Sequence, residues 1–144
     1  MVLNDKDRLR FGWHCCELVR VQLKDSRAID AVSLLLSWLG RGKASAKEWM
    51  LASEGASVAW GERGTATDAP YGVVSCVVSY NNRWEIPETS EVHNTIVNAE
   101  RAGLTLAELA AWLRKHTKPN FSENVPETEY TGLLKYYSAR MKVG

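Results

Sequence analysis

Long apolar runs, an excess of one charge and paired cysteines are all missing from this sequence. No stretch approaches the roughly 18 consecutive apolar residues that a membrane-spanning helix needs, and the charged N-terminus lacks the apolar core of a signal peptide. The 18 Lys and Arg residues against 17 Asp and Glu residues leave a net charge of only +1, which disfavours binding to the phosphate backbone of nucleic acids. The 3 cysteines do not form the even, spaced framework of a secreted disulfide protein. We therefore expect a cytoplasmic protein with reduced thiols and no membrane-spanning segment.

Patterns that carry catalysis or bind metals are missing as well. There is no recognisable pairing of a nucleophile with a base, no pair of catalytic carboxylates and no phosphate-binding glycine loop. Glu91 and His93 could form an acid/base pair, but a solvated helix face is the simpler interpretation. The sequence predicts a protein that is not an enzyme and that needs no cofactor. The histidines are scattered along the chain, at His14, His93 and His116.

The adjacent residues His14, Cys15 and Cys16 suggest metal ligands at first sight. Neighbours on a helix point about 100° apart, and no second cluster of Cys and His completes a tetrahedral zinc site. Free cysteine packs mainly as a small hydrophobic side chain. We therefore predict buried thiols and no metal site.

What the sequence does contain is the composition of one packed domain. Its 144 residues are 45% hydrophobic and 24% charged, and such a length buries about two-thirds of the unfolded surface. The 6 tryptophans are many for this length, and we interpret most of them as core anchors. The expected fold is all-α, a single domain over residues 1–144 that forms a compact bundle of about six to seven helices.

The first three helices are predicted over about 4–23, 26–39 and 46–60 from the spacing of apolar residues. Gly40 and Gly42 are expected to end the second helix. Ser45 and Glu48 have the spacing of a capping box at the start of the third. The second helix has a wide apolar face, so we expect the segment 26–60 to form the structural centre.

Residues 69–86 are ambiguous between helix and strand. The valines at 73, 74, 77 and 78 have strand propensity, and Asn81-Asn82 is typical of a hairpin turn, so a β-hairpin over 71–86 is the alternative. Asp68 and Pro70, however, are typical of a helix start, and the valines have helical spacing. We predict a helix here.

Three further helices complete the predicted bundle. One begins near Ser90 and ends at Gly103, and the next begins with a second capping box, formed by Thr105 and Glu108, and ends before Pro119. The last begins at Pro126 and carries a stripe of tyrosines and leucines.

Two stretches, RLRFGWHCCELV and DSRAIDAVSLLLSWLGRGKASAKEWMLAS, resemble helical immunity proteins of bacterial polymorphic toxin systems. The resemblance covers residues 8–60, and it implies a helical fold and a protein that acts by binding rather than by catalysis. It transfers no catalytic residue. The matching positions are Phe11, Cys15, Cys16, Arg27, Ala28, Gly42, Ala44, Ser45 and Glu48.

The functional hypothesis is a non-enzymatic protein-binding protein, an inhibitor or immunity-type factor of bacterial or phage origin. Its contact surface is expected on the loops 61–68 and 81–91 and on the last helix. The acidic residues of the second loop would suit a basic partner such as a toxin, a nuclease or a defence effector, although a plain solvated loop remains the alternative. The predicted partner-binding residues are Trp84, Glu85, Glu88, Glu91, Tyr130, Tyr136 and Tyr137.

The alternative function is a helix-turn-helix-like nucleic-acid-binding regulator. Residues 102–120 have the pattern of one helix of such a motif, with basic residues at its end. Cations are also favoured at any helix C-terminus, and Pro119 blocks a second helix a few residues later. The protein partner is therefore favoured over nucleic acid.

Overall fold

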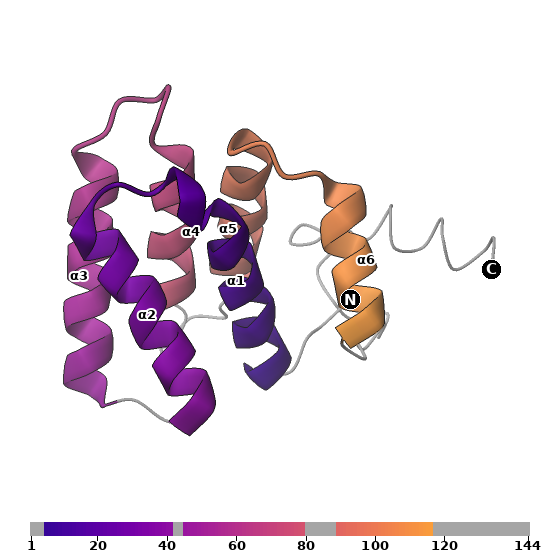
Figure 1. The fold of residues 1–144 in the computed structure, drawn as a ribbon, viewed down its shortest axis with the longest axis horizontal. Helices are drawn as coiled ribbons and strands as arrows, with labels where there is room; N and C mark the ends of the chain where they lie inside the picture. The colour runs from indigo at the N-terminus through magenta and orange to yellow at the C-terminus, as the bar shows by residue number, and fades with distance from the viewer. Residues whose placement is uncertain (1–4, 42–44, 80–88, 117–144) are drawn as a thin grey trace.

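The computed structural model describes residues 5–41, 45–79 and 89–116, which are helical almost throughout (Figure 1). No strand occurs in these ranges, so the all-α prediction is confirmed there. None of the described helices is long and apolar enough to cross a membrane. The elements are α1 (Asp5–Val19), the 3₁₀ turn η1 (Arg20–Gln22), α2 (Ser26–Arg41), α3 (Ala46–Gly61), α4 (Ala69–Val78), α5 (Thr89–Arg101) and α6 (Leu106–His116). The predicted last helix from Pro126 lies outside the described residues.

Helix α4 is the core of the bundle. All ten of its residues are buried, and it packs against α1, α2, α3 and α5. Neighbouring helices surround α4, so its valines are buried on every side of the helix. This packing overrides the strand propensity of valine. The predicted helix is confirmed over 69–78, and the hairpin alternative is wrong over 71–78. The rest of that alternative, residues 80–86, lies outside the described residues.

The expectation that 26–60 forms the structural centre is wrong, because α2 and α3 are outer helices of the bundle. Figure 1 shows α3 at one edge, with α2 and α4 beside it. Leu36 of α2 is exposed, as are Met50 and Leu51 of α3. A wide apolar face therefore does not place α2 at the centre of the bundle.

The helix ends confirm most of the local predictions. Ser45 and Glu48 form a reciprocal capping box with N···O distances of 3.1 and 3.2 Å, and Thr105 and Glu108 form another at 3.2 and 3.0 Å. Gly103 adopts φ +103° after α5, a conformation that glycine reaches without strain. Gly40 does not end α2, which continues through Arg41. Nothing crowds Gly40, and its helical backbone needs no left-handed conformation.

The tryptophan and cysteine side chains contribute to the core as predicted. Trp49 is buried and meets Trp38 edge to face, with ring centroids 5.4 Å apart. Trp13, Trp60 and Trp112 are partly buried against the core as well. Trp84 lies outside the described residues. The buried thiols belong to Cys15, Cys16 and Cys76.

Candidate functional site

Most of the predicted partner-binding residues fall outside the part of the chain that the structure describes. Only Glu91 falls within it, in the first turn of α5. The arrangement of these residues relative to one another therefore lies outside the described residues. The residues outside the described ranges are Trp84, Glu85, Glu88, Tyr130, Tyr136 and Tyr137.

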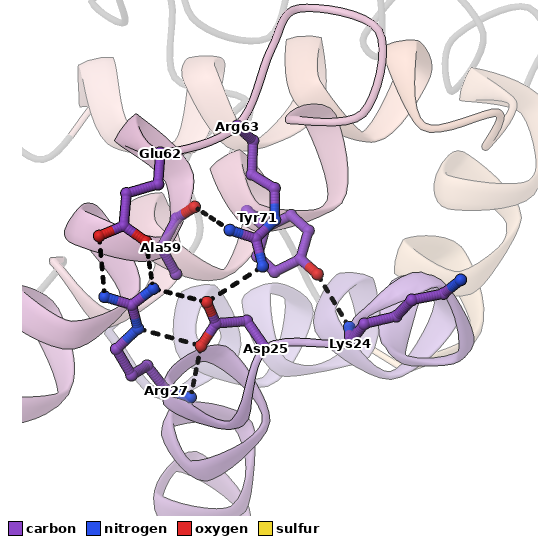
Figure 2. Close-up of polar contacts among 7 residues, drawn as sticks. All are labelled: Lys24, Asp25, Arg27, Ala59, Glu62, Arg63 and Tyr71. Atoms are coloured by element: carbon purple, nitrogen blue, oxygen red, sulfur yellow. Dashed lines mark hydrogen bonds and ion pairs between the residues drawn. The ribbon is translucent and has the colours of Figure 1, made fainter.

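The described residues contain a different polar cluster, which joins the start of α2 to the end of α3 and to α4 (Figure 2). Its chemistry was not anticipated from the sequence. We call it the Asp25 cluster, and its members are Lys24, Asp25, Arg27, Ala59, Glu62, Arg63 and Tyr71.

Asp25 is the acceptor at the centre of this cluster. It precedes α2 directly, and its Oδ1 accepts hydrogen bonds from the backbone N–H and the Nε of Arg27, at 2.9 and 3.0 Å. Its Oδ2 accepts from Nη2 of Arg27 at 2.6 Å and from Nη2 of Arg63 at 3.0 Å. The side chain is only 11% exposed. Asp25 thus caps α2 and holds two arginines at once.

The two arginines extend the cluster to α3 and α4. Arg27 donates to both carboxylate oxygens of Glu62, at 3.3 and 2.5 Å. Arg63 donates to the carbonyl oxygen of Ala59 at 3.2 Å, and its guanidinium carbon lies 4.3 Å from the centroid of the Tyr71 ring. This placement is a cation–π contact.

Tyr71 connects the cluster back to the chain before α2. Its hydroxyl oxygen accepts a hydrogen bond from the backbone N–H of Lys24 at 2.8 Å. Tyr71 belongs to the buried helix α4. The cluster therefore anchors the loop before α2 directly to the core helix.

The electrostatics of the cluster favour fixed charges over proton transfer. The hydrogen bonds from Arg27 hold the pKa of the Asp25 carboxyl well below its usual range, and they also lower the pKa of Glu62. The hydrogen bond to Asp25 in turn raises the pKa of Arg27. A carboxylate that is ionised and bonded to arginine at neutral pH is a poor general base. The cluster therefore has the properties of a structural connection between helices.

We expect Asp25→Ala to destabilise the protein more than Asp25→Asn does. Alanine removes the cap of α2 and leaves both arginines without this acceptor, whereas the asparagine oxygen can keep the cap. Urea unfolding followed by circular dichroism measures the difference. Because the folded-state pKa is lowered, the contribution of Asp25 is fully present above about pH 4 and declines as the pH falls further. The stability of Asp25→Asn should therefore fall less steeply at acid pH than that of the wild type. An equally steep fall would show that the ionised Asp25 does not stabilise the fold in this way.

A second ion pair joins the loop after α3 to α5. Asp68 accepts from Nη2 of Arg101 at 2.7 Å and from Nε1 of Trp60 at 3.2 Å. Arg101 also donates to Oδ1 of Asn98 at 3.1 Å and to the carbonyl oxygen of Thr65 at 3.2 Å. The loop is thereby tied to two helices.

The acidic side chains of the loop 61–68 were expected to face a partner protein. In the structure Glu62 and Asp68 form ion pairs with Arg27 and Arg101. These pairs could not be predicted from the sequence, because the partners are 35 and 33 residues apart along the chain. The one local signal was the charge pattern of Asp25 and Arg27 at a helix start.

Comparison with known proteins gives no family for this chain. No protein-family model, no curated protein and no solved structure matches it. The chemistry must therefore be judged from the residues themselves. Within the ranges that the structure describes, no three or more His, Cys, Asp and Glu side chains gather as metal ligands would. Burial raises the pKa of the Cys16 thiol well above its ordinary value, which makes this sulfur a poor nucleophile.

Two histidines enclose a tryptophan where α6 meets α1. The His14 and Trp112 rings are stacked, with centroids 4.6 Å apart and planes at 14°. The ring of His116 lies 4.8 Å from Trp112 on the same helix. Burial lowers the pKa of His14, the nearby His116 lowers it further, and Glu108 opposes the shift. This environment favours the neutral form of His14.

This stack predicts that stability falls on mild acidification. Because the folded-state pKa of His14 is lowered, its contribution is fully present above the unfolded value of about 6.5 and is lost as the pH falls through that value. His14→Phe keeps an aromatic ring beside Trp112 but cannot be protonated. We therefore expect the urea midpoint of this variant to fall less than that of the wild type between about pH 7 and pH 5. A decline equal to that of the wild type would show that His14 does not cause it.

Proposed function

We propose that this protein is a non-enzymatic protein-binding protein, an inhibitor or immunity-type factor of bacterial or phage origin that blocks a partner protein. The observation that carries the proposal is the use of the charged side chains. Asp25, Glu62 and Asp68 are all bonded to arginines that hold helices together. Charges used in this way stabilise the helical scaffold. A scaffold of rigid helices suits a protein that acts by offering a binding surface to a partner.

The proposed contact surface begins at the N-terminus of α5. Glu91 stands in the first turn of that helix, and Glu85 and Glu88 precede it in the sequence. Helix α5, which carries Glu91, packs closely on the core helix α4. The remaining residues of the proposed surface are Trp84, Tyr130, Tyr136 and Tyr137.

The chemistry of these residues defines the partner. Acidic side chains attract a basic protein surface and raise the rate of association, and aromatic side chains supply most of the binding energy of compact interfaces. A basic toxin, nuclease or defence effector fits this description. The resemblance of residues 8–60 to immunity proteins implies a protein that acts by binding.

A charge-reversal pull-down tests this proposal. The tagged full chain serves as bait in an extract of its native host, and the captured proteins are quantified by mass spectrometry. We expect a basic protein that is captured by the wild type and lost with the triple variant Glu85→Lys, Glu88→Lys and Glu91→Lys. The matched control is Glu100→Lys, which reverses an exposed charge elsewhere on α5. No enriched protein, or equal capture by the triple variant, would overturn the proposal.

A nucleic-acid-binding regulator is the second candidate. Helices α5 and α6 are joined by residues 102–105, and a short turn that contains glycine is typical of helix-turn-helix motifs. The last turn of α6 holds Arg114, Lys115 and His116. Titration of labelled DNA over a range of salt concentrations tests this candidate. Micromolar affinity that falls steeply with salt would favour it over the protein partner.

A further inference from the structure

Helix α6 is attached to the bundle differently from the other described helices. Figure 1 shows it on the side away from α3, and its backbone approaches those of the other described helices at few points. Helices α1, α2, α3 and α5, by contrast, all pack closely on α4. The attachment of α6 depends on side chains, among them the buried Leu109, Ala110 and Leu113. This helix can therefore separate while the helices around α4 stay packed.

The contact between α6 and α1 contains two titratable rings. The Trp112 ring of α6 lies 6.0 Å from the Phe11 ring and is stacked on His14, with centroids 4.6 Å apart. About one turn further along α6, the ring of His116 lies 4.8 Å from that of Trp112. The carbonyl oxygen of His116 also accepts a hydrogen bond from Nη1 of Arg10 at 3.3 Å. Two imidazoles and a guanidinium therefore meet where α6 joins α1.

The charged groups around this contact compensate poorly for a proton on either imidazole. Glu108 of α6 favours the protonated form of His14, but its carboxylate already accepts a hydrogen bond in the capping box of α6. On α1, Asp7 is bonded to Arg10 at 3.3 Å. The last turn of α6 adds the basic residues Arg114 and Lys115. Cations therefore outnumber carboxylates before either histidine is protonated.

We propose that this contact is an acid-sensitive switch, in which protonation of His14 and His116 releases α6 from α1 while the helices around α4 stay folded. Histidine ordinarily changes charge between about pH 5 and pH 8. Each proton adds a positive charge beside Trp112, and the two charges repel each other while α6 is docked. Release separates the histidines, which lie on different helices, and returns them to water. The switch does not depend on the proposed partner protein.

The direction of the switch follows from the burial of His14. Docking lowers the pKa of His14, so the docked state is most stable above about pH 6.5 and loses stability as the pH falls below that value. A release that takes up one proton changes its equilibrium by up to about tenfold per pH unit. A protonated imidazole is also attracted to the face of a tryptophan, but here two imidazoles share one tryptophan, so their repulsion opposes that attraction.

Amide hydrogen exchange of the full chain tests the switch. Exchange is measured by mass spectrometry between about pH 7 and pH 5 and corrected for the intrinsic rate at each pH. We expect the protection of the α6 amides from Leu109 onward to fall by about tenfold and to stay below that of α4 at every pH. Low urea concentrations should accelerate exchange in α4 much more than in α6, because a local release exposes little surface. Equal exchange and equal urea dependence in both helices, or α6 protection that is constant or rises on acidification, would overturn the proposal.

Three variants assign the effect to the two histidines. The double variant His14→Phe and His116→Phe keeps aromatic rings beside Trp112 and should lose the fall in α6 protection, whereas His93→Gln, which removes the remaining histidine, should keep it. Glu108→Gln keeps a capping-box side chain but removes the compensating charge, so release should begin at higher pH. Circular dichroism at pH 7 verifies that each variant is folded. A double variant with the fall of the wild type, or a Glu108→Gln variant released at lower pH, would contradict the switch.

Discussion

Phe11→Ala is expected to lower the free energy of unfolding by about 3–5 kcal/mol. Phe11 of α1 is fully buried, and its ring centroid lies 6.0 Å from that of Trp112 in α6. Truncation loses the transfer free energy of the ring and leaves a cavity between the two helices, which their fixed neighbours cannot close. Urea unfolding monitored by circular dichroism measures the change.

The matched control for this truncation is Val21→Ala. Val21 follows the same helix but is 89% exposed, so its truncation should change the free energy of unfolding by no more than about 0.5 kcal/mol. Trp112 forms the other side of this contact and becomes more accessible to water when the Phe11 ring is removed. Its fluorescence should therefore also shift to longer wavelength in Phe11→Ala. A loss below about 1 kcal/mol would show that α6 does not pack on α1 as described.

Gly72→Val is expected to cost about 3 kcal/mol, because α4 and α5 approach each other too closely at this point for a side chain. A Cβ atom on Gly72 would lie 2.7 Å from both Cγ and Oδ1 of Asn98. Asn98 cannot move aside freely, since it is buried, donates to the carbonyl oxygen of Asn94 at 2.9 Å and accepts from Arg101 at 3.1 Å. Gly40→Val is the matched control, because nothing lies within 4 Å of a Cβ atom there.

A double-mutant cycle tests whether Asn98 is the obstacle. Asn98→Ala alone should be destabilising, because it removes buried hydrogen bonds. In the Gly72→Val background the same change also makes room for the valine, so the double variant should be more stable than the sum of the single effects predicts. Purely additive effects would assign the cost of Gly72→Val to something other than contact with Asn98.

Helix α4 lies at the centre of the bundle, where four other helices cover it. Gly72 allows α5 to approach α4 closely. The hydroxyl oxygen of Tyr71 accepts a hydrogen bond from the chain segment that leads into α2. On the side of α3, Ser57 and Ser75 lie within hydrogen-bond distance at 2.9 Å, and so do Ser53 and Ser79 at 3.2 Å. Small and polar side chains therefore set how closely α3 and α5 approach α4.

Residues close together in the sequence account for what could be predicted from the sequence alone. Each capping box joins residues three apart, and the left-handed turn at Gly103 depends on the conformation of one residue. The helix over 69–78 followed from the spacing of its valines and from Pro70 in its first turn. These features depend on neighbours along the chain, so the all-α fold could be predicted from their pattern.

Only the tertiary structure decided which charges meet and which helices cover α4. The burial of α4 had a local signal, because α4 contains no charged residue, whereas α2 contains Arg27, Asp30 and Arg41. Asp25 meets Arg63 across 38 residues, and Asp68 meets Arg101 across 33. Such pairs form because packing brings distant helix ends together, and a single sequence carries no record of that distance. The candidate site was missed for the same reason, whereas Glu91 was placed at a helix start from local signals alone.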